Sequence, residues 1–490
     1  MKRCRSQANR FAAVISLSLI IAEIVAAQTG PPYQGGSQAA ESAPASPGIT
    51  APAISQQNPF SGSVPQGKAT AESIPLSFKD VIDLGLKNNL GLLLQSDATL
   101  AARGQKWKEL SDLLPNLSGA ISENASQVNL QAQGIRIPGI PPVIGPFGFF
   151  DARLYLKQSI LNLKALDRTR GARANEKAAE YTYKDARDIV VLAVGNAYLQ
   201  ALAGAARVDS AQAQFETAQA LHNKAVDQLN AGVSPAIDSL RAKVQMQSRE
   251  QQLIVAKNDY AKQKLALARA IGLPVAQEFT LTDEAPYEPL TAMGLEESLR
   301  RAYFSRSDYL AAVQQVRAAE HFRRAATAEH FPGIDFSGNY GDLGVNPGNS
   351  HGTFQVSGIL TIPIFAGGKT HADVLQAEAT LRQNRQQLEN LREQIEYEIR
   401  TAVLDLEAAS EQVRVAQSSV DLANQTLTQA RDRFTAGVTD NLEVVQAQES
   451  VASANESYIS SLYAHNLAKV SLARAIGFAE QGVRQYLQSH

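Results

Sequence analysis

Residues 230–272, NAGVSPAIDSL…LALARAIG, occur again as residues 435–477, TAGVTDNLEVV…VSLARAIG. The two stretches align without a gap, because Gly232 pairs with Gly437 and Arg269 with Arg474 at the same separation. A repeat of this length indicates that one structural unit was used twice. We therefore expect function to come from a doubled architecture rather than from a single site.

Two very long helices are expected, at about 162–230 and 368–435, because neither stretch contains proline. The second carries a seam of apolar residues at alternating steps of three and four, in which large side chains alternate with alanine. This heptad pattern predicts supercoiling against a neighbouring helix. The seam consists of Ile399, Ala402, Leu406, Ala409, Val413, Ala416, Val420, Ala423, Leu427, Ala430 and Phe434. In the first copy, the small residues of this seam recur every seven positions, at Ala197, Gly204, Ala211, Ala218 and Ala225.

Each long stretch is followed by the tripeptide Ala-Gly-Val and then by a shorter helical stretch, 236–271 or 441–476. Gly232 and Gly437 stand where the end of a helix favours a left-handed residue. The chain is therefore expected to form two helical hairpins rather than an ordinary two-stranded coiled coil.

Two segments with period-two patterning precede each long helix. They span 117–129, 150–160, 334–345 and 353–364. Loops rich in proline and glycine, 131–148 and 346–352, separate the members of each pair. Alternating strands of about ten residues are typical of outer-membrane barrels, and their symmetric placement favours a barrel over a soluble sheet with one wet face. Loop 131–148 is unusually apolar for an extracellular loop, and the pattern gives no account of it.

Four strands cannot close a barrel, and an open strand edge in lipid would leave backbone groups unpaired. The missing strands must then come from other copies of the chain. Two copies would give a barrel filled by its own side chains, whereas three give a 12-stranded barrel with room for water. The polar second face of the strands fits the larger barrel.

The N-terminal part of the chain predicts export. Residues 1–27 resemble a signal peptide, with a basic start, the apolar run 11–21 and small residues before a cleavage site. An uncleaved anchor is disfavoured, because a membrane span needs about 20 apolar residues. The single cysteine, Cys4, lies in this segment, so the mature chain is expected to carry no disulfide or lipid anchor. Residues 28–74, rich in Pro, Gly, Ser, Ala and Gln, are expected to form a disordered tail.

Composition argues against several classes of function. A net charge of −2 lacks the positive footprint expected of a nucleic-acid-binding protein. The seven histidines are scattered without metal-ligand spacing, and the sequence has no recognisable nucleophile and base. We expect no catalytic residue, no cofactor and no metal site, and therefore no enzyme.

The order and spacing of several marks resemble those of the outer-membrane efflux family, the TolC-like channels. The marks are 76–89 (LSFKDVIDLGLKNN), Leu114-Pro115, Phe331-Pro332, Ile362-Pro363-Ile364-Phe365 with Gly367-Gly368, and the two hairpin sequences. The resemblance covers about 75–478. It divides the chain into a first repeat, 75–275, a second repeat, 276–478, and a C-terminal tail, 479–490.

The resemblance implies a mixed α and transmembrane β fold. A homotrimer would form a 12-stranded outer-membrane barrel, four strands per chain, continued by a long α-helical periplasmic barrel. An equatorial region would be built from 273–300 and the C-terminal residues. The implied partners are the lipid bilayer, a periplasmic adaptor (membrane fusion) protein and an inner-membrane RND or ABC transporter. The chain would be a passive exit duct for small molecules, such as drugs or metals.

Two alternative functions remain. The same duct could serve a type I protein secretion system, and the sequence does not separate these cargoes. A periplasmic adaptor is the other alternative, but adaptors carry one helical hairpin within a small β domain rather than two hairpins and four strands.

The resemblance also implies a gate. In the family, acidic residues six and nine positions after the glycine of the last hairpin form constriction rings. Those positions are Glu443 and Gln446 here, and the first copy has Asp238 and Arg241. Three Glu443 carboxylates around one axis would favour cations. Alternatively, Glu443 is a first-turn residue stabilised by the helix dipole.

Contacts with the adaptor are expected at the hairpin tips, where the same residues could equally pack within the trimer. The tips consist of Leu229, Asn230, Ala231, Gly232, Val233, Ser234, Phe434, Thr435, Ala436, Gly437, Val438 and Thr439.

Overall fold

The computed structural model describes residues 59–132, 134, 138–283, 287, 290, 294–436, 438–439, 441–480 and 482. The predicted signal peptide lies outside these residues, as do 28–58 of the predicted tail, Gly437 and most of the predicted C-terminal tail.

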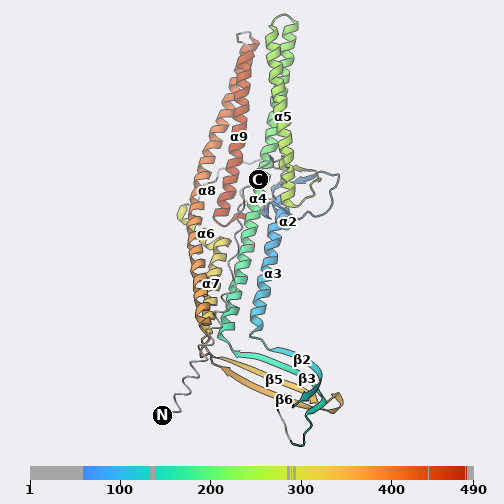
Figure 1. Cartoon of the computed structure of the whole chain (residues 1–490). Helices are drawn as coiled ribbons and strands as arrows, with labels where there is room; N and C mark the ends of the chain where they lie inside the picture. The colour runs from blue at the N-terminus through green and yellow to red at the C-terminus, as the bar shows by residue number, and fades with distance from the viewer. Residues whose placement is uncertain are drawn as a thin grey trace, which may run out of the picture. The chain divides into compact units, whose positions relative to one another are not determined.

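Two long helices dominate the described chain (Figure 1). They are α4 (Leu163–Asn230), with 68 residues, and α8 (Lys369–Thr435), with 67. At 1.5 Å per residue each is about 100 Å long. The helices α5 (Ala236–Ile271) and α9 (Asn441–Ala475) return along them. The two predicted hairpins are therefore confirmed.

The predicted seam of α8 packs against α9. Ile399, Ala402, Leu406, Ala409, Val413, Ala416, Leu427 and Ala430 are buried, while Val420, Ala423 and Phe434 are partly buried. Leu427 and Ala430 form one apolar cluster with Val444 and Ala447 of α9. Small and large side chains alternate along the seam, which lets the two backbones approach closely.

Shorter elements recur in the same order in both halves. The first half begins with α2 (Phe78–Asn88) and α3 (Leu90–Ser111), and the second with α6 (Leu295–Ser305) and α7 (Ser307–Ala328). A two-stranded parallel sheet, β1 (Ile74–Leu76) with β4 (Phe279–Leu281), joins the start of one half to the start of the other. The internal duplication of the sequence is thus a duplication of the fold.

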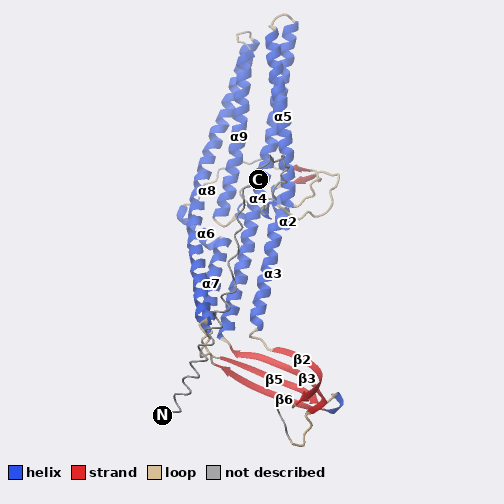
Figure 2. Cartoon of the chain, in the orientation of Figure 1, coloured by secondary structure: helices blue, strands red, loops and turns tan. Residues whose placement is uncertain are grey.

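Four strands form one antiparallel sheet in the order β2-β3-β5-β6 (Figure 2). They are β2 (Asn116–Asn129), β3 (Val143–Leu161), β5 (Gly333–Gly344) and β6 (Ser350–Thr361). The short 3-10 helix η2 (Pro347–Asn349) connects β5 to β6. The pairing of β3 with β5 joins the two halves within one sheet.

Two strand boundaries differ from the prediction. The strand β3 begins at Val143, inside the predicted loop 131–148. It tolerates Pro146 because this part of β3 pairs with β2 alone, so that one side of the strand needs no donor. The strand β6 starts at Ser350 and ends at Thr361, so Ile362 and Ile364 follow the strand rather than continue it.

The prediction of a disordered tail over 28–74 is wrong for residues 59–74. The 3-10 helix η1 (Pro59–Ser61) places the Phe60 ring against Gly91, and Ser63 forms a bridge to Asn89. The Thr70 amide donates to the Gln277 side chain at 2.7 Å. Pairing with backbone and side-chain partners orders this polar segment, which composition alone did not predict.

One described helix, α4, contains an 18-residue window of mean hydropathy 1.7, apolar enough to cross a membrane. Because 56% of that window is buried inside the chain, packing within the protein accounts for its composition. The window overlaps a core shared by α2, α4 and α5, in which Val190, Val194 and Tyr198 are fully buried.

Candidate functional site

The four-stranded sheet has one polar and one apolar face, because residues in register share a face. One row across the strands consists of Ser118, Tyr155, Asn339 and Gln355. The next row, on the other face, consists of Gly119, Leu154, Tyr340 and Phe354. In that row the three large side chains are 53%, 69% and 76% exposed. An exposed apolar face opposite a polar one suits a barrel wall with lipid outside and water inside.

Two charged residues on the polar face of the sheet, Asp151 and Arg153, form an ion pair. The Arg153 guanidinium donates to Asp151 Oδ1 at 2.7 Å and to Asn339 Oδ1 at 3.4 Å, and it lies 5.3 Å from the centre of the Tyr155 ring. The polar face is therefore organised by side-chain contacts between β3 and β5.

The two hairpin tips are closed by equivalent backbone hydrogen bonds. The Val233 amide donates to the Gln228 carbonyl at 3.0 Å, and the Val438 amide donates to the Arg433 carbonyl at 3.0 Å. Gly232 adopts a left-handed φ of 74°, and its equivalent Gly437 lies outside the described residues. Val233 and Val438 are 75% and 69% exposed, so each tip presents a valine to solvent.

The predicted gate residues are held differently in the two hairpins. Glu443 pairs with Arg433 at 2.8 Å and accepts a hydrogen bond from the Thr439 hydroxyl. Asp238 accepts from the Ser234 hydroxyl at 3.2 Å and lies 3.8 Å from Arg241. Gln446 is exposed. The structure thus brings Asp238 together with Arg241, whereas Glu443 contacts a cation that was not predicted.

Arg433 could have been found from the repeat. Its equivalent in the first copy is Gln228, so the second hairpin gained a positive charge at the same place in the turn. Arg433 and Glu443 are ten positions apart, so their contact is not visible in the linear sequence and forms only because the hairpin turn brings them together.

Polar contacts join the two hairpins along α9. Glu449 pairs with Arg249 of α5 at 2.7 Å, and Glu456 pairs with Arg207 of α4 at 2.9 Å. The Tyr463 hydroxyl donates to Asn196 of α4 at 2.6 Å. Arg249 is only 3% exposed. One face of α9 is therefore apolar toward α8, and the other is polar toward the first hairpin.

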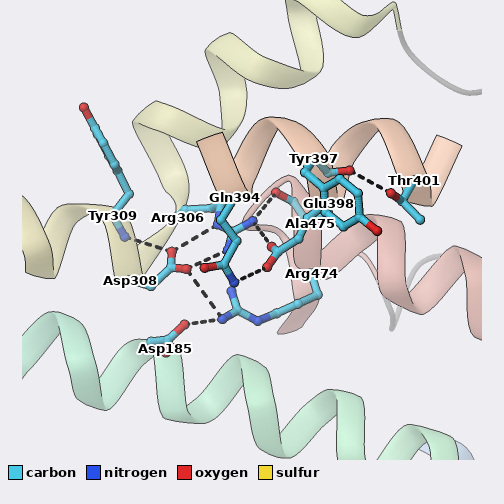
Figure 3. Close-up of polar contacts among 10 residues, drawn as sticks. All are labelled: Asp185, Arg306, Asp308, Tyr309, Gln394, Tyr397, Glu398, Thr401, Arg474 and Ala475. Carbon is cyan, nitrogen blue, oxygen red and sulfur yellow. Dashed lines mark hydrogen bonds and ion pairs between the residues drawn. The ribbon is translucent and has the colours of Figure 1, made fainter. Parts of the chain in front are cut away.

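A buried ion network surrounds Arg306, between α6 and α7 (Figure 3). Its side chain is 2% exposed and pairs with Asp308 at 2.6 Å and with Glu398 of α8 at 2.6 Å. It also donates to the Ala475 carbonyl at the end of α9, at 3.2 Å. One guanidinium thus connects three helices of the second repeat.

Arg474 extends this network into the first repeat. It pairs with Asp185 of α4 and approaches Asp308 at 4.0 Å. Burial raises the pKa of Asp185, and the neighbouring Asp308 adds to this, against the attraction of Arg474. Burial likewise raises the pKa of Asp188 to about 6, with Asp185 and Glu480 adding to it. Burial also opposes ionisation of Asp308, but Arg306 and Arg474 together outweigh it and hold the pKa of Asp308 below its usual value.

The sequence analysis did not predict this network. Arg474 was recognised only as a mark of the repeat, and Arg306 stood out in no pattern. No group of three or more His, Cys, Asp or Glu side chains suited to a metal ion occurs in the described part of the chain.

The sheet has one apolar face suited to lipid, and the duplication supplies two helical hairpins with exposed tips. Together these features define a membrane channel that is continued by helices. A family model described as outer membrane efflux protein matches residues 100–273 and 299–478. The chain belongs to this family. It is therefore an outer-membrane component of an efflux system, located in the outer membrane and the periplasm. The family is a transport family rather than a known enzyme family.

Relatives and solved structures agree with this assignment. Outer membrane protein OprJ of Pseudomonas aeruginosa is 26% identical over 435 residues, which are 82% of this chain and 84% of that protein. Alkaline protease secretion protein AprF of the same species is 21% identical over 393 residues, 77% of this chain and 81% of that protein. The crystal structure of the Campylobacter jejuni CmeC outer membrane channel matches with a TM-score of 0.72 at 20% identity, covering 86% of this chain and 92% of that chain. The expected efflux-channel fold is confirmed.

Proposed function

We propose that three copies of this chain form one duct that passively carries small molecules out of the cell. A periplasmic adaptor would hold the duct to an inner-membrane RND or ABC transporter, which supplies the energy. The observation that carries the proposal is the open edge on each side of the four-stranded sheet.

Among the described residues, β2 and β6 each pair on one side only. Their second sides carry backbone groups that lipid cannot satisfy. Pairing the β6 edge of one copy with the β2 edge of the next satisfies both. Three copies then close a 12-stranded barrel, and the apolar face with Leu154 and Phe354 meets the lipid.

The helices support the same closure. Contacts place them in the order α3, α4, α7, α8, which matches the order of the strands, so α3 and α8 lie at the two edges. Exposed large residues recur on α3 and just beyond it with heptad spacing at Leu93, Leu100, Trp107 and Leu114. Exposed residues also recur at the start of α8, where Gly368, Ala372 and Ala379 are small and Leu375 is large. The large side chains of the α3 edge can pack between the mostly small ones of this edge.

The experiment places a charge on this edge. Trp107→Glu should break the trimer, because it buries an unpaired carboxylate between copies. Ala98→Glu is the matched control, since Ala98 is exposed on another side of the same helix. Light scattering of the detergent-purified protein measures the assembly, and drug susceptibility of cells measures export. A Trp107→Glu variant that remains trimeric would contradict this arrangement of the copies.

Glu443 is proposed as a gate residue whose negative charge is partly neutralised by Arg433. Three carboxylates near the axis would favour cations, and each Arg433 would weaken that preference. Glu443→Gln should lower cation selectivity in single-channel recordings, and Arg433→Gln should raise it. If neither variant changes the selectivity, the gate lies elsewhere. Gln446, Asp238 and Arg241 are secondary candidates on the same two hairpins.

The hairpin tips are proposed to contact the adaptor, because each tip exposes a valine whose amide makes an equivalent hydrogen bond to the end of the long helix. Cysteines replacing Val233 and Val438 should cross-link to an adaptor in the periplasm. If they cross-link only between copies of this chain, the tips serve assembly of the trimer instead.

Protein secretion is the second candidate, and the similarity to the alkaline protease secretion protein AprF supports it. Deletion of the gene separates the two cargoes. Loss of an exported protein with unchanged drug susceptibility would favour secretion, and the reverse would favour efflux of small molecules.

A further inference from the structure

The β2–β3 hairpin continues beyond the rest of the sheet. The last row that contains all four strands consists of Glu123, Phe150, Gly344 and Ser350. Past this row, 124–129 pairs with 143–149 alone. At about 3.3 Å per residue, this extension is about 20 Å long. It lies at the end of the strands away from α3 and α4, and therefore on the outer side of the membrane.

Two phenylalanines of this extension lie on the polar face of the sheet. Phe149 pairs with Asn124 and Phe147 with Ser126, in the same alternation as Asp151 with Ser122 further down. Phe149 and Phe147 are 46% and 44% exposed. Phe150, the next residue, belongs to the apolar face. The face that is polar along the barrel wall therefore becomes aromatic at its outer end.

The extension is also almost without charge. Between Glu123 and Asp151 the sequence contains a single charged residue, Arg136. Covering the face of a water-exposed hairpin that carries two phenylalanines lowers the free energy, because it removes apolar surface from water. Lipid cannot cover it, because the lipid-facing side chains lie on the opposite face.

The dimensions allow the hairpins of neighbouring copies to cover one another. Twelve strands about 4.8 Å apart and tilted by about 40° give a wall about 12 Å from the axis. The extension is longer than this distance. It also carries a bulge between Ser126 and Val128, and bulges bend a strand.

We propose that the three β2–β3 extensions meet over the outer mouth of the duct and form an apolar constriction lined by Phe147 and Phe149. The occupant of each aromatic face is the same face of the neighbouring copies. This inference rests on the trimer proposed above. It gives the duct a barrier at the outer end, separate from the hairpin tips, which would limit the entry of water and ions when nothing is exported.

Cysteine cross-linking tests whether the extensions meet. The sequence has one cysteine, Cys4, within the predicted signal peptide, so an introduced thiol would be the only one in the mature chain. Phe149→Cys in the full-length protein should give covalent dimers with a short bifunctional thiol reagent. Phe150→Cys, the neighbouring residue on the opposite face, is the matched control and should not cross-link.

Conductance tests whether the contact is a constriction. In planar bilayers, the double variant Phe147→Ala/Phe149→Ala should conduct at least about twice as well as the wild type, whereas Phe150→Ala should not change conductance. Cross-linking with unchanged conductance would overturn the role as a constriction. A trimer in which Phe149→Cys does not cross-link would overturn the proposal and leave the duct intact. A monomeric protein in detergent would overturn both.

Discussion

The junction between the two short helices, α2–α3 in the first repeat and α6–α7 in the second, has the same backbone geometry in both repeats but is stabilised by different side chains. Asn89 ends α2 and precedes α3 with φ −63° and ψ 129°. Arg306 does the same between α6 and α7 with φ −63° and ψ 119°. The backbone is thus the same, while a neutral amide stands in one copy and a guanidinium in the other.

The returning helices meet these junctions in the same way. Asn88 donates to the Ile271 carbonyl at 3.0 Å, and Ser305 donates to the Ile476 carbonyl at 2.8 Å. A Cβ on Gly272 would lie 2.5 Å from Asn88, and one on Gly477 would lie 2.7 Å from the Arg306 backbone nitrogen. Glycine is therefore required at both places.

The side chains then diverge. Asn89 bonds locally, donating to the Phe60 carbonyl at 2.8 Å and accepting from the Leu92 amide at 3.3 Å. Arg306 bonds to α8 and α9, and through Asp308 and Arg474 its network reaches α4 of the other repeat. The backbone of the junction is therefore shared by both copies, but only the junction of the second copy is linked by an ion network to the other repeat.

The largest effect is expected from breaking the charged junction. Arg306→Met leaves the carboxylates of Asp308 and Glu398 without their buried partner and should cost about 2–4 kcal/mol of unfolding free energy. Asn89→Leu at the neutral junction loses a cap and should cost about 1–2 kcal/mol. Urea denaturation of the detergent-purified protein, followed by circular dichroism, compares the two. Equal losses would contradict the distinction between the junctions.

A smaller effect, dependent on pH, is expected on the α4 side of the network. The folded-state pKa of Asp188 is raised from 3.8 to about 6, so the folded protein binds this proton more tightly than the unfolded chain. Stability from this group therefore falls as pH rises from about 4 to 6. Asp188→Asn should stabilise the protein by about 1–3 kcal/mol at pH 7 and have little effect at pH 4. Denaturation at both pH values measures the difference, and a gain that is independent of pH would rule out the titration.

The smallest effect is expected where the two copies agree. Ser305→Ala and Asn88→Ala each remove one hydrogen bond to the equivalent carbonyl, and each should cost about 1 kcal/mol. The same denaturation measurement applies. A Ser305→Ala loss as large as that of Arg306→Met would mean that the shared frame, and not the ion network, holds the second junction.

Local patterns predicted the helical part of the fold closely. The heptad seam and the Ala-Gly-Val turns identified helices ending at Asn230 and Thr435, because periodicity and turn chemistry are local. The start of β3 was missed, because Gly145, Pro146 and Gly148 are unusual in a strand and are tolerated here where β3 pairs on one side only. The order of residues 59–74 was missed as well, because their partners, such as Gln277, are distant in sequence.

The candidate site was predicted less completely. The tips were placed correctly in the hairpin turns, and Glu443 in the first turn of α9, because both follow from the repeat. Arg433 and the Arg306 network were not predicted. A buried guanidinium is recognisable only once the helices that surround it are known, and no periodic pattern marks it.

The sheet order also constrains how the protein reaches its membrane. The β3–β5 contact is made within one chain, so the sheet of a single copy can form in water before any lipid is present. The unpaired sides of β2 and β6 prevent that copy from entering a bilayer alone. Insertion and oligomerisation are then one event, and until it occurs the apolar face with Tyr340 and Phe354 remains exposed to water. The biogenesis of this channel is thereby coupled to the concentration of its own chains.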